Sequence, residues 1–152
     1  KNKKNEYEVF TDNGREKTKW NARDWVKVIE KKGAGEIFLT SIDNDGTSKN
    51  FDFNLVNEIS KNVGIPVICH GGGSNVEDII EVSSKTEISG ISLATMLHYN
   101  LIFFNKKFRN QAISINDNLL RISNMSLKKK MFKNNLKDLK QLINKKFISR
   151  NI

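Results

Sequence analysis

The chain has only one cysteine, Cys69, and one proline, Pro66, among its 152 residues. A single cysteine excludes an internal disulfide framework and is typical of a reducing compartment, so we expect a cytoplasmic protein. Long apolar runs are also missing, since none approaches the roughly 18 residues that a membrane span needs. Residues 1–8 are mostly charged and lack the apolar stretch of a secretory signal, so we expect no such signal here.

Acidic residues are scarce at one end of the chain only. Residues 1–104 carry 13 Lys and Arg against 15 Asp and Glu, whereas residues 105–152 carry 13 against 2. The net charge of +9 therefore belongs to the C-terminal segment, and nucleic-acid binding would concern that segment alone. A lysine run such as residues 128–130 is more often a solvated helix face, so nucleic acid is not an expected partner.

Two parts are expected on this basis, a body of residues 1–104 and a basic, mostly helical C-terminal extension of residues 105–152. The extension contains apolar residues spaced 4, 3, 4 and 4 positions apart, which predicts an amphipathic helix with a basic far face. These residues are Phe132, Leu136, Leu139, Ile143 and Phe147.

The body alternates between short apolar runs and amphipathic segments. The run 36–42 (EIFLTSI) is almost continuously apolar, as in parallel strands that are buried on both faces. Repeated strand–helix units of this kind predict an α/β fold with parallel strands. Strands are expected at 6–11, 36–42, 66–69 and 88–94, and helices at 22–32, 53–62 and from 76 onward. The first strand should end in a turn at residues 12–14, whose types tolerate left-handed backbone. Asn21, and Ser74 or Asn75, are the expected caps of the first and third helices, and Gly33 should end the first.

Three expected strand ends carry residues suited to binding a ligand, which parallel α/β sheets hold at this edge. Residues 40–47 (TSIDNDGT) combine acids with a glycine that lets the backbone approach a ligand. Residues 70–74 (HGGGS) open a helix, and glycine amides at a helix start form a phosphate cradle. Ala94 and Thr95 begin a further short helix whose free amides can complete that cradle.

Two of these strand ends also have an interpretation other than phosphate binding. A glycine triplet is more often a turn than a ligand site. The Asp-x-Asp-Gly loop that ends at Gly46 could suggest calcium, but it lacks the further spaced acids of an EF-hand. We therefore expect no metal and no cofactor.

The same stretches resemble one known family. Residues 33–47 (GAGEIFLTSIDNDGT) resemble the sixth-strand signature GAGEILLTSIDRDGT of the cyclase subunits of imidazole glycerol phosphate synthase, a (β/α)8-barrel family of histidine biosynthesis. Residues 65–72 (IPVICHGG) are similar to the seventh-strand IPVIASGGAG. Ala94, Thr95, His98 and Tyr99 resemble the eighth-strand AAS-x-x-HF.

A complete barrel of this type needs about 250 residues, so the resemblance implies a C-terminal half. That half would hold strands 6–8 with their helices, preceded by a hairpin strand of the fifth loop and followed by the basic extension.

The resemblance also implies roles for individual residues. The family's substrate has a phosphate at each end, and Asn13 and Gly14 match the flexible fifth loop that touches its middle. Thr40 falls near the reacting centre, and Glu36, at the opposite strand end, matches a bottom-face glutamate that ammonia passes on entry. The phosphate site would comprise Asp45, Gly46, Gly71, Gly72, Ala94 and Thr95.

The sequence departs from the family at a few positions. His70 stands where the family usually has serine, and either a ligand contact or the capping of a loop would suit a histidine there. Thr95 replaces serine and keeps the hydroxyl. The family's two catalytic aspartates lie on the first and fifth strands and are not in this chain, and Asp45 is only a supporting acid. We therefore expect the chain alone to be inactive.

The partners implied are a glutaminase subunit that supplies ammonia, a phosphorylated small-molecule substrate, and either the missing N-terminal half-barrel or a second copy of the chain. Two alternatives stay open. One is a paralogous amidotransferase subunit of surface-polysaccharide sugar synthesis, and the other is a non-catalytic half-barrel that acts as a binding module.

Overall fold

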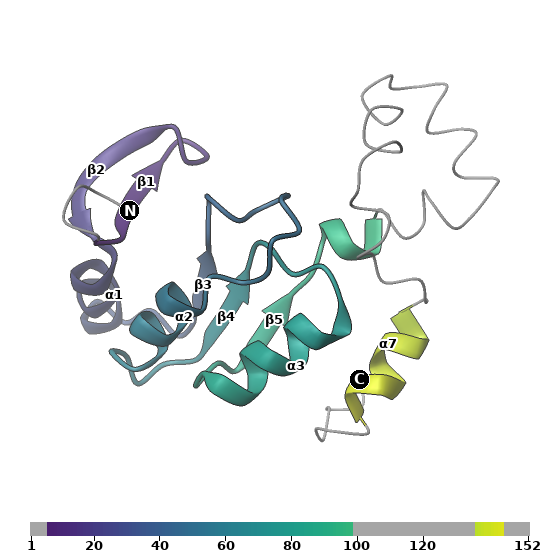
Figure 1. Ribbon diagram of the computed structural model, residues 1–152. Coiled ribbons are helices and arrows are strands. Elements are labelled where there is room, and N and C mark those ends of the chain that lie inside the picture. Colours follow the sequence, from purple (N-terminus) through teal and green to yellow (C-terminus); the bar gives the residue numbers. More distant parts are fainter. Residues whose placement is uncertain (1–5, 99–135, 145–152) are drawn as a thin grey trace.

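A computed structural model describes residues 6–98 and 136–144 (Figure 1). Three parallel strands form the central sheet in the order β3-β4-β5, and an antiparallel pair, β1-β2, precedes it. The predicted α/β class with parallel strands is thus confirmed. The strands are β1 (Glu8–Thr11), β2 (Glu16–Asn21), β3 (Ile37–Thr40), β4 (Val67–His70) and β5 (Gly90–Ser92). The helices are α1 (Ala22–Lys31), α2 (Phe53–Ser60), α3 (Val76–Lys85) and α7 (Leu136–Asn144).

A polar side chain caps the start of each of the first three helices. Asn21 accepts a hydrogen bond from the Arg23 amide, and Asp52 accepts one from the Leu55 amide. Asn75 accepts one from the amide three residues on, as an N-cap residue does. The predicted helices begin where these caps put them, although α2 ends at Ser60, two residues before its expected end.

The β1–β2 hairpin turns through three consecutive residues in the left-handed region. Asp12, Asn13 and Gly14 have φ angles of 48°, 55° and 83°. Asparagine, aspartate and glycine are the residues that tolerate this conformation, so the predicted turn is confirmed. The second strand, EKTKWN, was not expected, because its many charged residues give no strand signal of their own.

Helices α1, α2 and α3 lie on one face of the parallel sheet (Figure 1). Ile37 and Val67 pack with the apolar residues of α1 and α2, and Cys69 packs with those of α2 and α3. Leu39 and Ile91 lie against the same clusters. The five side chains of this face are therefore core residues under the helices.

The alternate residues form the other face of the sheet. Phe38 is 58% exposed, and neither it nor Ile68 belongs to a core cluster. Ile37, Leu39, Val67 and Ile91 therefore face the helices, and the alternate residues form the face that a closed barrel would turn inward. Because strand 36–42 is apolar at nearly every position, its sequence does not indicate which face meets the helices.

Helix α7 packs beside α3 and shares its core (Figure 1). Leu139 is 2% exposed and lies in one cluster with Val82 and Met96, and Ile143 packs against that cluster. The predicted amphipathic helix is confirmed for these two positions. Phe132 and Phe147 lie outside the described residues.

In the described part of the chain, no helix is both long and apolar enough to cross a membrane.

Candidate functional site

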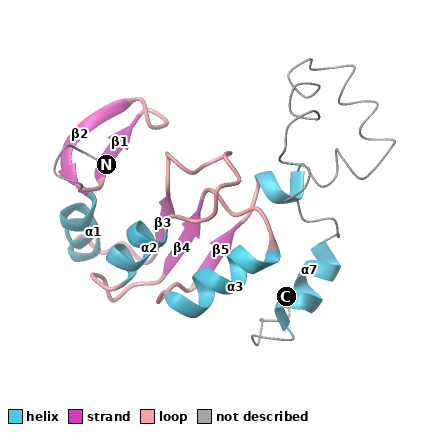
Figure 2. Cartoon of the chain, in the orientation of Figure 1, coloured by secondary structure: helices cyan, strands magenta, loops and turns pink. Residues whose placement is uncertain are grey.

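The carboxyl ends of the three parallel strands lie side by side (Figure 2). The register pairs Thr40 with His70 and His70 with Ser92. By strand alternation all three residues belong to the face turned away from the helices. Thr40 thus stands in a row of three polar residues at this edge, and Ser92 is a member that the sequence did not single out.

The loop after β3 folds back over the end of β4. The buried Ser41 donates its amide hydrogen to the His70 carbonyl (3.1 Å), and the Ser41 carbonyl accepts from the Asp45 amide (2.9 Å). Gly46 follows in the left-handed region with φ 71°. These bonds bring Asp45 and Gly46 to the ends of the strands.

The glycines after β4 admit this loop because they have no side chain. Gly71 and Gly72 have φ angles of 97° and 99°, which favour glycine. A Cβ at Gly71 would lie 2.8 Å from the Ser41 carbonyl oxygen, and one at Gly72 would overlap the Asn50 carbonyl. The Asn50 amide donates to the Gly72 carbonyl (2.9 Å). The two loops are therefore in direct backbone contact.

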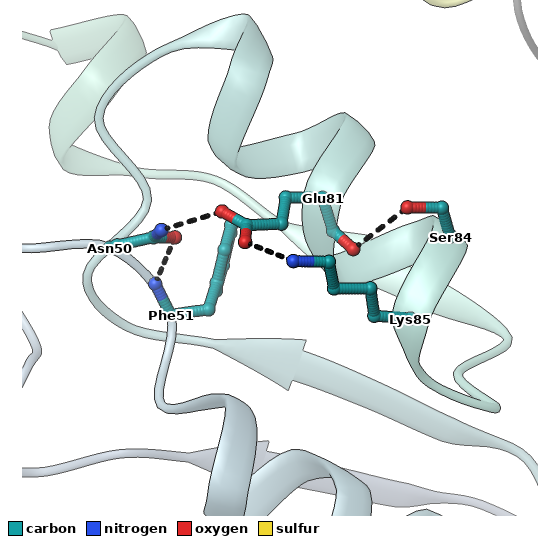
Figure 3. A network of polar contacts seen from close by, with 5 residues as sticks. All are labelled: Asn50, Phe51, Glu81, Ser84 and Lys85. Atoms are coloured by element: carbon teal, nitrogen blue, oxygen red, sulfur yellow. Dashed lines mark hydrogen bonds and ion pairs between the residues drawn. The ribbon is translucent and has the colours of Figure 1, made fainter.

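Asn50 connects the same loop to α3, as Figure 3 shows. Its side-chain amide donates to Glu81 Oε2 (3.3 Å), and its Oδ1 accepts from the Phe51 amide (2.7 Å). Glu81 also pairs with Lys85 at 2.7 Å, and this bond chiefly lowers the pKa of the Glu81 carboxyl. Asn50 itself has φ 87°, so its strained backbone is held by contacts on both sides.

The start of α3 is already occupied by side chains. Ser74 is buried and donates its amide and its hydroxyl to Asp78 Oδ2, at 2.9 and 2.8 Å. Asn75 caps the Asp78 amide. The Ser74 amide is thus not available to a ligand, which leaves the glycine loop before it as the place where an anion can meet backbone amides.

His70 contacts two of the three strand ends. Its Nδ1 lies 3.2 Å from the Ser92 carbonyl oxygen, and its Nε2 lies 3.5 Å from Asp45 Oδ1. The Phe38 ring is its neighbour, with centroids 5.5 Å apart. Of the two roles considered for this histidine, holding a loop is the one that these contacts support.

The third strand end leads into a helical turn at residues 95–98. The Ala94 carbonyl accepts from the Leu97 and His98 amides, and Met96 is buried in the core below. Ala94 is exposed and Thr95 is half-buried. Both residues therefore lie at the same edge as Asp45.

The hairpin turn reaches this edge from the other side. A Cβ at Gly14 would lie 3.2 Å from the Ile42 side chain, so the turn with Asn13 lies against the loop after β3. Glu36 lies at the opposite end of the sheet, where it is exposed and precedes Ile37, whose amide bonds to the Pro66 carbonyl. Apart from Glu36, the predicted site residues thus come from segments that end or turn at one edge.

Among residues 6–98 and 136–144, no three histidine, cysteine, aspartate or glutamate side chains form a metal-binding group. The thiol of Cys69 is fully buried, and desolvation raises its pKa to about 12. A thiolate is the form that reacts or binds metal, so Cys69 is an inert core residue.

Ser92, Ser41, Asn44, Asn50 and Asp78 are the polar residues of this edge that sequence reasoning missed. The signal for Asn44 and Asn50 is their spacing around Gly46 in the polar stretch 43–50, since asparagine often bonds to nearby backbone. In the structure the Asn44 side chain donates to the Asn50 carbonyl (2.9 Å) and closes the loop.

Known proteins are similar to this chain in sequence. The subunit HisF of imidazole glycerol phosphate synthase from Prochlorococcus marinus (strain MIT 9515) is 45% identical over 97 residues, which is 64% of this chain and 38% of that protein. The subunit of the same name from Bacillus subtilis (strain 168) is 43% identical over 93 residues, 61% of this chain and 37% of that protein. The chain therefore spans less than two fifths of the length of these relatives.

A family model described as "Histidine biosynthesis protein" matches residues 1–102. The match takes in every element from β1 to β5, together with the loops at the strand ends. Because it covers well over half of the sequence, the chain belongs to this histidine biosynthesis family, whose fold is the (β/α)8 barrel.

Proposed function

We propose that the chain is the C-terminal half of a cyclase subunit of imidazole glycerol phosphate synthase and supplies one of its two phosphate sites. The observation that carries this is the meeting of the loops after β3 and β4, where the Asn50 amide bonds to the Gly72 carbonyl. Residues 1–104 form the half-barrel, and residues 105–152 extend it, with Leu139 of α7 in the same core as α3.

The phosphate cradle comprises the amides of Gly46, Gly72 and Thr95, with Asp45, Gly71 and Ala94 beside them. Left-handed glycines leave amides without a side chain in front of them, and such amides bind phosphate oxygens well. Asn13 and Gly14 contact the middle of the substrate from the hairpin turn, and Thr40 lies nearest the reacting centre. The cradle therefore holds one end of a long substrate while chemistry occurs beside it.

The reaction proposed for the complete barrel joins ammonia to a phosphoribulosyl-formimino-aminoimidazole-carboxamide ribonucleotide. The substrate is cleaved and closed to imidazole glycerol phosphate and the aminoimidazole carboxamide ribotide. Ammonia comes from a glutaminase partner and passes Glu36 at the far end of the sheet. We place the enzyme in the cytoplasm, since its one thiol is reduced and buried.

Binding of the phosphorylated product to this chain tests the proposal. Imidazole glycerol phosphate should shift the amide NMR signals of Gly46, Gly72 and Thr95 together, and inorganic phosphate should shift the same three more weakly. The unphosphorylated imidazole glycerol is the matched control and should leave them unchanged. Signals that move only elsewhere, or that move equally with the control, would contradict the cradle.

The same titration separates the alternative. An amidotransferase of surface-polysaccharide synthesis acts on a sugar nucleotide, so a uridine diphosphate sugar should then displace imidazole glycerol phosphate. We expect no displacement, because the two relatives compared above both bear the synthase name. A half-barrel that serves only in assembly and binds no phosphate would show none of these amide shifts.

A further inference from the structure

The His70 ring lies between two hydrogen-bond acceptors. On one side is the Ser92 carbonyl of β5, 3.2 Å from Nδ1, and on the other is the Asp45 carboxylate, 3.5 Å from Nε2. A carbonyl and a carboxylate can only accept, so each needs a hydrogen on the nitrogen that faces it. The ring side chain is 18% exposed, whereas that of Asp45 is 47% exposed. The histidine is thus the fixed member of the pair.

A neutral imidazole carries one N–H and cannot serve both acceptors. If the hydrogen is on Nδ1, the ring bonds to Ser92 and turns a lone pair toward the carboxylate. Only the doubly protonated ring donates on both sides and also pairs its charge with Asp45. A hydrogen bond to Asp45 that leaves the Ser92 contact in place therefore requires the doubly protonated ring.

Asp45 belongs to the segment that brings Gly46 to the strand ends. The segment is anchored at Ser41 by the Asp45 amide (2.9 Å) and at Gly72 by Asn50 (2.9 Å), but its tip is held from the β4–β5 side by His70. A carboxylate beside an anion site also repels the anion, and an adjacent imidazolium offsets that charge.

Few other groups can substitute for this contact. The neighbours of the ring on β3 and β4, Phe38, Thr40 and Ile68, are uncharged, and Cys69 points to the helices. The loop between Gly71 and Asn75 has no ionisable residue. The remaining ionisable residues of the three strand-end loops are Asp43, Lys49 and His98.

We infer that His70 is a positioning residue of the anion-binding edge, which in its doubly protonated form latches Asp45 and Gly46 to the ends of β4 and β5. The inference deepens the proposed function, since it concerns the same phosphate cradle. The latch is closed when the ring is doubly protonated and open when a neutral ring bonds only to the Ser92 carbonyl.

The latch can be tested by NMR on the full 152-residue chain, first without and then with a bound anion. Between about pH 5 and pH 8, the range in which histidine side chains change charge, the Asp45 and Gly46 amide signals should move along the His70 ring titration. Sulfate keeps its charge over this range and serves as the probe. The affinity of the chain for sulfate should fall about tenfold from the low to the high end of this pH range. A change of this size corresponds to the loss of one partly exposed charge-assisted hydrogen bond.

Two substitutions separate positioning from charge alone. In His70→Gln the amide nitrogen takes the place of Nε2 and donates to Asp45 at every pH. In His70→Asn the amide takes the place of Nδ1 and keeps only the Ser92 contact. We expect flat profiles for both, with sulfate affinity near the wild-type low-pH value for the first and near the high-pH value for the second. His98→Asn, which removes the other histidine, should keep the wild-type profile.

Equal and weak sulfate binding by the two His70 variants would show that charge and not positioning matters, and would overturn the inference. So would Asp45 and Gly46 signals that ignore the His70 titration, even with sulfate bound. Loop signals that follow His70 while sulfate fails to bind to any variant would support the latch and refute the proposed phosphate cradle. The His70 latch and the phosphate cradle would thus be contradicted by different measurements.

Discussion

At Gly72 the backbone approaches its neighbour too closely for any side chain. A Cβ there would overlap the Asn50 carbonyl, and φ is 99°, so Gly72→Ala adds both a clash and backbone strain. We expect a loss of about 2–4 kcal/mol in the free energy of unfolding, measured by urea denaturation. The amide shifts caused by imidazole glycerol phosphate should also disappear, because the loops after β3 and β4 can no longer meet.

Gly35→Ala is the matched control for this change. A Cβ at Gly35 would have no atom within 4 Å, and the residue is not in the left-handed region. Its stability should stay within about 0.5 kcal/mol of the wild type. If Gly72→Ala were equally harmless, the contact between the two loops would not be a fixed feature of the protein.

Conformation at single residues was predictable where its cause is local. Asp12, Asn13 and Gly14 were expected to turn in the left-handed region, because their own side chains permit it. Asn50 has the same backbone conformation, yet its cause is remote. The residue is held by Gly72 and Glu81, and a sequence without known contacts does not show such partners.

The residue that caps helix α2, Asp52, also binds the segment before β1. Asp52 Oδ1 accepts from the Leu55 amide (3.0 Å) and from the Tyr7 hydroxyl (2.7 Å), which ties the segment before β1 to α2. Asp52→Ala removes both bonds and should lower stability by about 2 kcal/mol, whereas Tyr7→Phe removes one and should cost about 1 kcal/mol. A double-mutant cycle by urea denaturation should give a coupling energy of about 1 kcal/mol.

The Tyr7 contact also predicts an alkaline limit. Burial, followed by the hydrogen bond to Asp52, raises the pKa of Tyr7 above its ordinary value. The bond is therefore fully present below the unfolded tyrosine value of about 10, and its stabilisation is lost as pH rises beyond it. In Tyr7→Phe this part of the alkaline decline should be missing. An identical decline in both proteins, or additive effects in the cycle, would show that the pair is not coupled.

Element boundaries were predicted better than element faces. Asn21, Asn75 and the glycine after α1 are local signals, and they placed helix ends to within two residues. The direction of the β3 side chains could not be predicted, because Phe38 looks as suitable for the core as Ile37. The position of the helices decides which face of the strand becomes part of the core, and that position depends on the whole chain.

For the molecule as a whole, the uncovered face of the sheet is the dominant feature. Phe38 is 58% exposed, whereas Ile37 on the opposite face is 5% exposed. Within the described residues, β3 and β5 each pair with β4 alone, so both outer edges of the parallel sheet present unpaired backbone. Large apolar side chains and open strand edges together are typical of a surface that another polypeptide covers.

If the chain is the proposed half-barrel, it needs a second half to close, and the proposed chemistry needs groups that the resemblance places on the first and fifth strands. General acid–base catalysis contributes about 10²–10⁴-fold, and it requires proton-transfer groups next to the substrate. In the proposed site Thr40 and Asp45 orient the substrate and do not replace the two aspartates. We therefore expect the 152-residue chain to associate with itself and to show no cyclase turnover.

Sedimentation velocity and a complementation assay check this expectation together. The chain should sediment as an oligomer at micromolar concentration, and mixing it with a separately made N-terminal half that carries both aspartates should restore turnover. Phe38→Glu places a charge on the uncovered face and should weaken both associations at least about tenfold. Leu142→Glu changes an exposed apolar residue of α7 away from that face and is the control. A monomeric chain would show that the face is already covered, and turnover by the chain alone would show that the catalytic groups lie within these 152 residues.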